Sequence, residues 1–110
     1  AGFFSEPVDL VTLDASFISL RLLLPAVCAS APTARVVALV KPQFEAGRRD
    51  GGKGGVVRSE AARERAVREV CDCAAALGYT LLGTVESPVK GPKGNVEFLI
   101  HLLPPAPEHR

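Results

Sequence analysis

The run of residues 35–40 (RVVALV) is the feature that most limits the folds open to this chain. It is rich in valine and does not alternate between apolar and polar residues, which is typical of a parallel strand covered on both faces. The proline of Lys41-Pro42 then prevents simple continuation of the strand's hydrogen bonding. We therefore expect residues 35–40 to form a central strand of an α/β sheet.

A second strand and a helix are predicted before this run. Residues 8–13 (VDLVTL) are short, apolar and β-compatible, and they predict a buried strand. An apolar helix is expected to follow, with Ser16 as its N-cap. Pro25 falls inside or near the end of this helix, so we expect a kink or a break there.

A glycine-rich basic segment and a second helix are predicted after the run. Residues 44–58 (FEAGRRDGGKGGVVR) hold five glycines and four basic side chains, and they predict a mobile surface loop. Ser59 is expected to cap a helix in which apolar residues recur at helical spacing, and Gly78 is a natural stop for it.

The C-terminal third predicts two more strands, residues 79–85 and 96–103, joined by a Pro/Gly turn at residues 87–95. Because only a turn separates these strands, we expect them to pair antiparallel or to lie close together at one edge. Residues 104–110 are expected to be a disordered tail. The predicted fold class is α/β, with a mainly parallel sheet and an antiparallel last strand.

Size and composition indicate one small soluble domain. The 110 residues suffice for a single core, and 47% hydrophobic with 23% charged residues is the balance of a globular protein. No apolar run approaches the roughly 20 residues that span a bilayer, and no signal peptide is expected. Three cysteines without framework spacing favour reduced thiols in a cytoplasmic protein, and they do not predict a metal site.

Three charged residues are predicted to meet at one edge of the sheet. Asp14 and Lys41 each follow a predicted parallel strand, where ligands of open α/β sheets bind. Glu97 begins the last strand, and it reaches the same edge if that strand runs antiparallel. The alternative is that Asp14 caps a helix and that Lys41 and Glu97 are solvated charges. The glycines of residues 51–55 have neither P-loop nor dinucleotide-binding spacing.

Five segments of the sequence have unusual local patterns: LDASFISL (13–20), LVKPQFEAG (39–47), KGGVVR (53–58), SPVKGPKGN (87–95) and GNVEFL (94–99). In order and at similar separations, they resemble the signature segments of the TlyA (haemolysin A-like) family, which is related to the FtsJ-type methyltransferases. The resemblance covers nearly the whole chain.

This resemblance implies the second half of a Rossmann-like methyltransferase that depends on S-adenosyl-L-methionine and methylates a ribose 2′-hydroxyl of ribosomal RNA. The family's Lys-Asp-Lys-Glu tetrad falls on Asp14, Lys41 and Glu97, and Asp14 would lie nearest the cofactor's methyl group. The first lysine and the glycine-rich cofactor loop would belong to an N-terminal half. Residues 1–110 would then be the C-terminal half of the domain and inactive alone.

The chemistry leaves two roles open for Lys41. Desolvation would let it act as a base towards the target hydroxyl, whereas nearby carboxylates would keep it charged as an orienting group. In either role, aligning the hydroxyl supplies a large part of the catalysis.

A basic surface is predicted to contact ribosomal RNA or a ribosomal subunit through phosphates. The alternative is a solvated loop that only keeps the protein soluble. The residues are Arg48, Arg49, Lys53, Arg58, Lys90 and Lys93.

Other functions and an assembly state were weighed beside the enzyme. A haemolytic or cytotoxin-like activity, suggested by the family's historical name, has no membrane-length segment to support it. A non-catalytic RNA-binding module on a methyltransferase-like fold remains the main alternative, and a dinucleotide enzyme lacks its fingerprint. An exposed strand edge would favour a homodimer of this chain.

Overall fold

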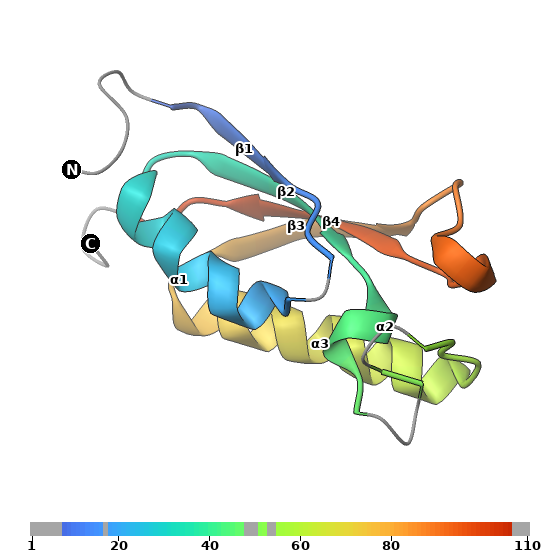
Figure 1. The fold of residues 1–110 in the computed structure, drawn as a ribbon. Helices are drawn as coiled ribbons and strands as arrows, with labels where there is room; N and C mark the ends of the chain where they lie inside the picture. Colours follow the sequence, from blue (N-terminus) through green and yellow to red (C-terminus); the bar gives the residue numbers. More distant parts are fainter. Residues whose placement is uncertain (1–7, 17, 48–50, 53–54, 107–110) are drawn as a thin grey trace.

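The computed structural model describes residues 8–16, 18–47, 51–52 and 55–106, and it shows a four-stranded sheet with helices against one of its faces (Figure 1). The strands lie in the order β1-β2-β4-β3. The elements are β1 (Leu10–Leu13), α1 (Leu20–Ser30), β2 (Arg35–Val40), α2 (Pro42–Glu45), α3 (Glu60–Ala76), β3 (Thr80–Glu86), the 3₁₀ helix η2 (Pro92–Gly94) and β4 (Phe98–Leu103).

The strand directions confirm the predicted fold class. β1 and β2 pair in parallel, and β4 pairs antiparallel with both β2 and β3. Three of the four strands therefore run the same way and β4 runs against them. The pairing of Val40 with Phe98 places the end of β2 beside the start of β4.

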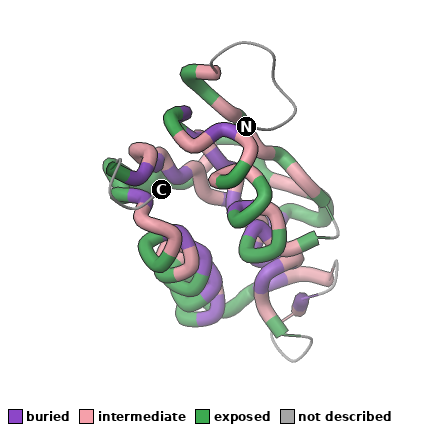
Figure 2. Tube along the Cα trace, turned by 90° about the vertical axis from the view of Figure 1, so that its left-hand side faces the viewer, coloured by how far each residue is buried: buried purple, intermediate pink, exposed green. Residues whose placement is uncertain are grey.

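The core lies between the sheet and the helices α1 and α3. Buried positions of α3 recur along one side of the helix, where they face the sheet and α1 (Figure 2). The buried core cluster is Leu20, Leu24, Val36, Ala38, Val40, Val70, Ala74, Tyr79, Ile100 and Leu102.

None of the described helices covers the opposite face of the sheet (Figure 1). In β2 and β4, the residues that alternate with the core positions are only partly buried. Leu99 of β4 pairs with Val85 of β3, which is 60% exposed. Further along, Leu10 at the edge of the sheet is 53% exposed. This face is therefore largely apolar and open.

α1 differs from the prediction in its start and its continuity. Its N-cap is Ser19 rather than Ser16, and the Ser19 Oγ accepts a hydrogen bond from the Arg21 N–H at 3.0 Å. The helix continues through Pro25 to Ser30, so a break at Pro25, one of the two outcomes expected there, is wrong. Pro25 has no N–H for the Arg21 carbonyl one turn earlier. The Cys73 thiol donates to that carbonyl across the α1–α3 contact, with sulfur and oxygen 3.8 Å apart.

The predicted bounds of α3 are confirmed. The Ser59 hydroxyl accepts a hydrogen bond from the Ala62 N–H at 3.2 Å, as an N-cap should. At the other end, Gly78 adopts a φ of 100°, a left-handed conformation that favours glycine at a helix terminus.

Among its described residues, the glycine-rich segment is only in part the surface loop expected for residues 44–58. Its first residues belong to α2, and Gly52 and Val57 are buried. The side chain of Asn95 holds the end of the segment, because Oδ1 accepts from the Val57 N–H and Nδ2 donates to the Gly55 carbonyl, both at 2.9 Å. Residues 48–50 and 53–54 lie outside the described part of the chain.

β3 and β4 form the predicted hairpin, and η2 lies in the turn between them. The register shifts between Leu81 and Gly83, so Leu82 is the extra residue of a β-bulge. Every residue of β3 is exposed, as expected for an edge strand. Of the predicted tail, Pro105 is buried, and residues 107–110 lie outside the described part.

Candidate active site

Asp14 and Lys41 meet at the carboxyl ends of the two parallel strands. Lys41 Nζ lies 2.5 Å from Asp14 Oδ1 and donates to Ser16 Oγ at 3.2 Å. The Lys41 side chain is 11% exposed, whereas that of Asp14 is 68% exposed. The pair therefore presents a largely enclosed ammonium group and an open carboxylate at the predicted edge of the sheet.

Glu97 lies at the same edge and is held by a residue that the sequence analysis did not identify. Because Val40 pairs with Phe98, the residue after β2 and the residue before β4 are neighbours. The Glu97 carboxylate is buried and accepts a hydrogen bond from Gln43 Nε2 at 2.7 Å. The structure thus brings the three predicted residues to one edge, with Lys41 paired to Asp14 and Glu97 paired to Gln43.

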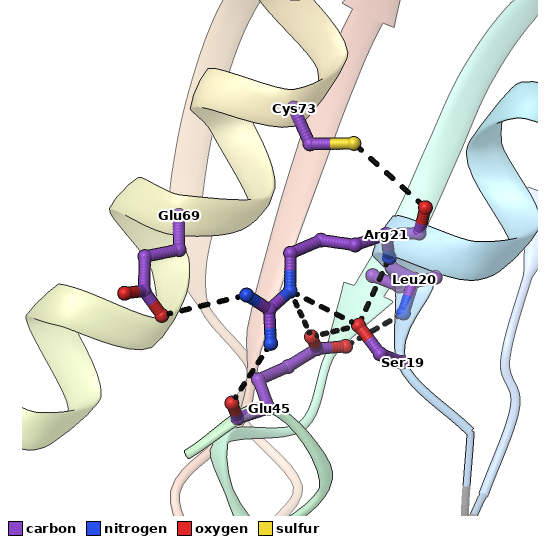
Figure 3. A network of polar contacts seen from close by, with 6 residues as sticks. All are labelled: Ser19, Leu20, Arg21, Glu45, Glu69 and Cys73. Carbon is purple, nitrogen blue, oxygen red and sulfur yellow. Dashed lines mark hydrogen bonds and ion pairs between the residues drawn. The ribbon is translucent and has the colours of Figure 1, made fainter. Parts of the chain in front are cut away.

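A second polar side chain of α2, that of Glu45, also holds the site's surroundings. Glu45 Oε2 accepts from the Leu20 N–H at 2.7 Å, and its Oε1 accepts from the Ser19 hydroxyl at 2.5 Å (Figure 3). Residues 41, 43 and 45 therefore contact three different parts of the chain. Polar residues at every second position after a strand, within KPQFE, are the sequence signal that could have identified Gln43 and Glu45.

The structure describes some of the predicted RNA-contacting residues but not others. Arg58, Lys90 and Lys93 are exposed. Arg48, Arg49 and Lys53 lie outside the described residues. Asn95 links residues 55–57 to the turn that carries Lys90 and Lys93, because its Nδ2 also donates to the Pro92 carbonyl at 3.0 Å.

The groups with shifted pKa values lie away from this edge, in the helix-covered core. Burial raises the pKa of the Tyr79 hydroxyl, and the nearby Cys28 thiol adds to the effect. Burial, with a smaller contribution from Asp72, raises the pKa of the Cys71 thiol. Both groups are therefore protonated near neutral pH, and they are poor candidates for a nucleophile. Among the helices of the described residues, none is both long and apolar enough to cross a membrane.

Polar side chains gathered beyond the carboxyl ends of parallel strands define the class of α/β proteins that bind ligands at that edge. A family model described as FtsJ-like methyltransferase matches residues 1–103. The chain belongs to the FtsJ-like methyltransferase family.

Individual relatives confirm the resemblance to TlyA. The 16S/23S rRNA (cytidine-2′-O)-methyltransferase TlyA of Mycobacterium tuberculosis is 50% identical over 97 residues, which cover 86% of this chain and 36% of that protein. Hemolysin A of Brachyspira hyodysenteriae is 36% identical over 106 residues, covering 92% of this chain and 42% of that protein. The solved structure of a candidate hemolysin from Streptococcus thermophilus is 42% identical with a TM-score of 0.86, covering 93% of this chain and 38% of that one. The chain thus spans less than half the length of these relatives.

Proposed function

We propose that this chain is the C-terminal half of the catalytic domain of a cytoplasmic ribosomal-RNA 2′-O-methyltransferase that is active only as a longer protein. The observation that carries the proposal is the contact of Lys41 with Asp14 at the carboxyl ends of β1 and β2, where a family member would bind its substrates. The name of the M. tuberculosis relative supports the reaction and its substrate. The short match to each relative supports the need for further sequence.

Lys41 is the proposed contact to the target hydroxyl. Its ammonium group is already hydrogen-bonded to Asp14 and Ser16, so it can orient the 2′-oxygen for in-line attack and stabilise the negative charge that develops there. The attack would form one oxygen–carbon bond as the donor's methyl–sulfur bond breaks, which would leave a neutral thioether, and the hydroxyl would release its proton. The open Asp14 carboxylate provides a route for that proton to solvent.

Glu97 is the proposed second anchor of the site. Its buried carboxylate is fixed by Gln43 on one side, and it lies beside the strand end that carries Lys41. From there it can orient a cationic side chain supplied by the remainder of the protein, which is the role that the family's tetrad implies.

The described residues fit S-adenosyl-L-methionine as the methyl donor. When bound, this cofactor supplies a methyl group on a positively charged sulfur. The Asp14 carboxylate is 68% exposed and stands at the sheet edge, so it offers a negative group to that charge. Asp14 is the residue of this chain that we assign to the cofactor.

RNA binding is assigned to the basic residues of two segments, 48–58 and 90–93. Because Asn95 bonds the Gly55, Val57 and Pro92 backbones, residues 55–57 of the first segment stay close to the second segment. Phosphate contacts by their lysines and arginines would give affinity that decreases as salt increases.

The test is transfer of labelled methyl from S-adenosyl-L-methionine to ribosomal RNA and to ribosomal subunits. The full-length protein should be active and this chain alone inactive. Lys41→Ala in the full-length protein should lower the rate at least a hundredfold, roughly the effect of losing one charge-stabilising donor. Lys90→Ala, with an exposed lysine, is the control and should mainly weaken RNA binding. Inactive full-length protein that still binds RNA would instead identify a non-catalytic RNA-binding module.

A further inference from the structure

We propose that Glu45 is a positioning residue for the pair formed by Asp14 and Lys41. Its carboxylate fixes the loop between β1 and α1, which carries Asp14, against α2, which begins after Lys41. This inference rests on the proposed function, because it assigns Glu45 a role in the same site.

Glu45 caps a helix to which it does not belong. Both carboxylate oxygens are used at the first turn of α1, one by the Ser19 hydroxyl and one by the Leu20 N–H (Figure 3). The side chain is only 2% exposed. A carboxylate at this end of a helix satisfies an N–H that has no partner within the helix, and it interacts favourably with the helix dipole. The contact therefore fixes where α1 begins relative to α2.

Arg21 extends this contact to the third helix. Its Nε lies 3.5 Å from Glu45 Oε1, and a terminal guanidinium nitrogen donates to the Glu45 backbone carbonyl at 3.3 Å. On its other side, the guanidinium lies 3.9 Å from Glu69 Oε1 of α3 (Figure 3). Glu45 is buried at the centre of this network, and Glu69 is at its exposed rim.

The network is connected to the active site by two short segments that contact each other at both of their ends. One segment runs from Asp14 to Ser19, and the other runs from Lys41 to Glu45. Lys41 and Asp14 join the segments at the sheet edge, whereas Glu45 and Ser19 join them at the helix end. Without the second contact, the loop could move away from α2, and the Asp14 carboxylate would move with it.

The deciding experiment compares Glu45→Gln with Glu69→Gln in the full-length protein. The amide keeps the size of Glu45 and one acceptor, but it removes the charge and one of the two capping contacts. We expect the turnover rate at saturating RNA to decrease about tenfold with the KM for RNA unchanged, since a small misplacement of reacting groups lowers the rate strongly. Glu69→Gln removes a charge from the exposed side of Arg21, and its turnover rate should stay within about twofold of that of the wild type. Equal rates for the wild type and Glu45→Gln would overturn the inference.

Two further measurements separate positioning from a general loss of structure. In an Asp14→Asn background, Glu45→Gln should lower the rate no further, because it acts through Asp14. A further tenfold decrease would mean a merely structural role. If Glu45→Gln does not fold, Ser19→Ala is the second variant. It removes the contact to Glu45 Oε1, the cap on the Arg21 N–H and the hydrogen bond from Arg21 Nε, and it should lower the rate about threefold. No change in that variant would count against the inference.

A readout without activity keeps this inference distinct from the proposed function. The ¹³C chemical shift of the Asp14 carboxylate, measured at one neutral pH, reports its contact with Lys41. Glu45→Gln should change this chemical shift, and an unchanged shift would contradict positioning. An inactive wild type would overturn the proposed function, while this chemical shift would still decide the role of Glu45.

Discussion

At the scale of single residues, the space around Glu97 is set by a glycine. Gly91 has no side chain, and a Cβ built there would lie 2.0 Å from Glu97 Oε2. The carboxylate is buried and bonded to Gln43, so it cannot move aside without losing that bond. The position of Glu97 therefore depends on a residue in the turn before β4.

Gly91→Ala should displace Glu97 and break its bond to Gln43. A hydrogen bond to a charged group contributes about 1.5–3 kcal/mol, so we expect lower stability together with a methyl-transfer rate reduced roughly tenfold or more. Gly83→Ala is the matched control, because nothing lies within 4 Å of a Cβ at that glycine. Equal activity in both variants would show that the position of Glu97 is not critical.

Tyr79 gives the fold a defined sensitivity to alkaline pH. Burial raises the pKa of its hydroxyl above the usual value of 10, so the unfolded chain releases this proton at lower pH than the folded chain does. The stabilisation is complete below pH 10 and is lost as the pH rises through the folded pKa. When the pH is raised from 8 to 11, the free energy of unfolding should therefore decrease by about 1 kcal/mol less in Tyr79→Phe than in the wild type.

Denaturant unfolding at the two pH values measures this difference. The chain has a single tyrosine, so the ultraviolet absorbance of tyrosinate reports the same ionisation directly. Tyrosinate formation at the ordinary pKa in the folded chain would contradict the prediction.

At this scale, sequence reasoning identified three charged residues and missed the residues that hold their surroundings. Asp14, Lys41 and Glu97 follow or precede strands, and strand direction alone places them at one edge. Gln43 and Glu45 belong to the short helix α2, which the sequence analysis did not predict. A single turn of helix has too few residues for a hydrophobic period to be visible.

At the scale of elements, α1 contains a proline that the structure accommodates without a break. Pro25 is exposed, and the Arg21 carbonyl that it leaves without an N–H partner accepts only a weak thiol hydrogen bond. The sequence suggested an interruption because proline usually disfavours a helix interior. Packing of Leu20 and Leu24 into the core outweighs that preference.

Pro25→Ala should stabilise the chain, because it restores the hydrogen bond to Arg21 and removes no buried side chain. We expect a gain on the order of 1–3 kcal/mol in the free energy of unfolding. Pro32→Ala is the control, since Pro32 lies in the turn that the Ala34 N–H closes onto the Ala31 carbonyl. That variant should lose up to about 1 kcal/mol. A lower free energy of unfolding in both variants would mean that Pro25 has a packing role.

The elements that sequence predicted best are those in which local pattern and tertiary packing agree. The bounds of β2 were predicted residue for residue, and α3 begins after Ser59 as its capping residue indicated. The start of α1 was wrong by several residues, because Glu45 supplies a cap from another part of the chain. No local pattern around Ser16 or Ser19 contains that contact.

At the scale of the whole molecule, the sheet has one face that no helix of the described residues covers and an edge at β1 (Figure 1). Val85 and Leu10 are among the exposed residues of this side. Exposed apolar surface and an unpaired strand edge favour association. We therefore expect this chain alone to form a homodimer.

Sedimentation velocity from micromolar to millimolar concentration tests this expectation. Val85→Lys, with a charge on the open face, should weaken association at least tenfold. Val89→Lys is the control, because Val89 is 73% exposed in the turn beyond β3. A monomer at every concentration would exclude the dimer.

The bulge at Leu82 decides what kind of assembly such a sheet can build. A bulged strand twists away from the flat geometry that a new strand needs, so β3 is a poor template, whereas β1 pairs with β2 in regular register. A sheet with two good templates can grow without limit into a fibre. A sheet with only one such edge can add a single further copy at that edge. Growth then ends, and the assembly is self-limiting.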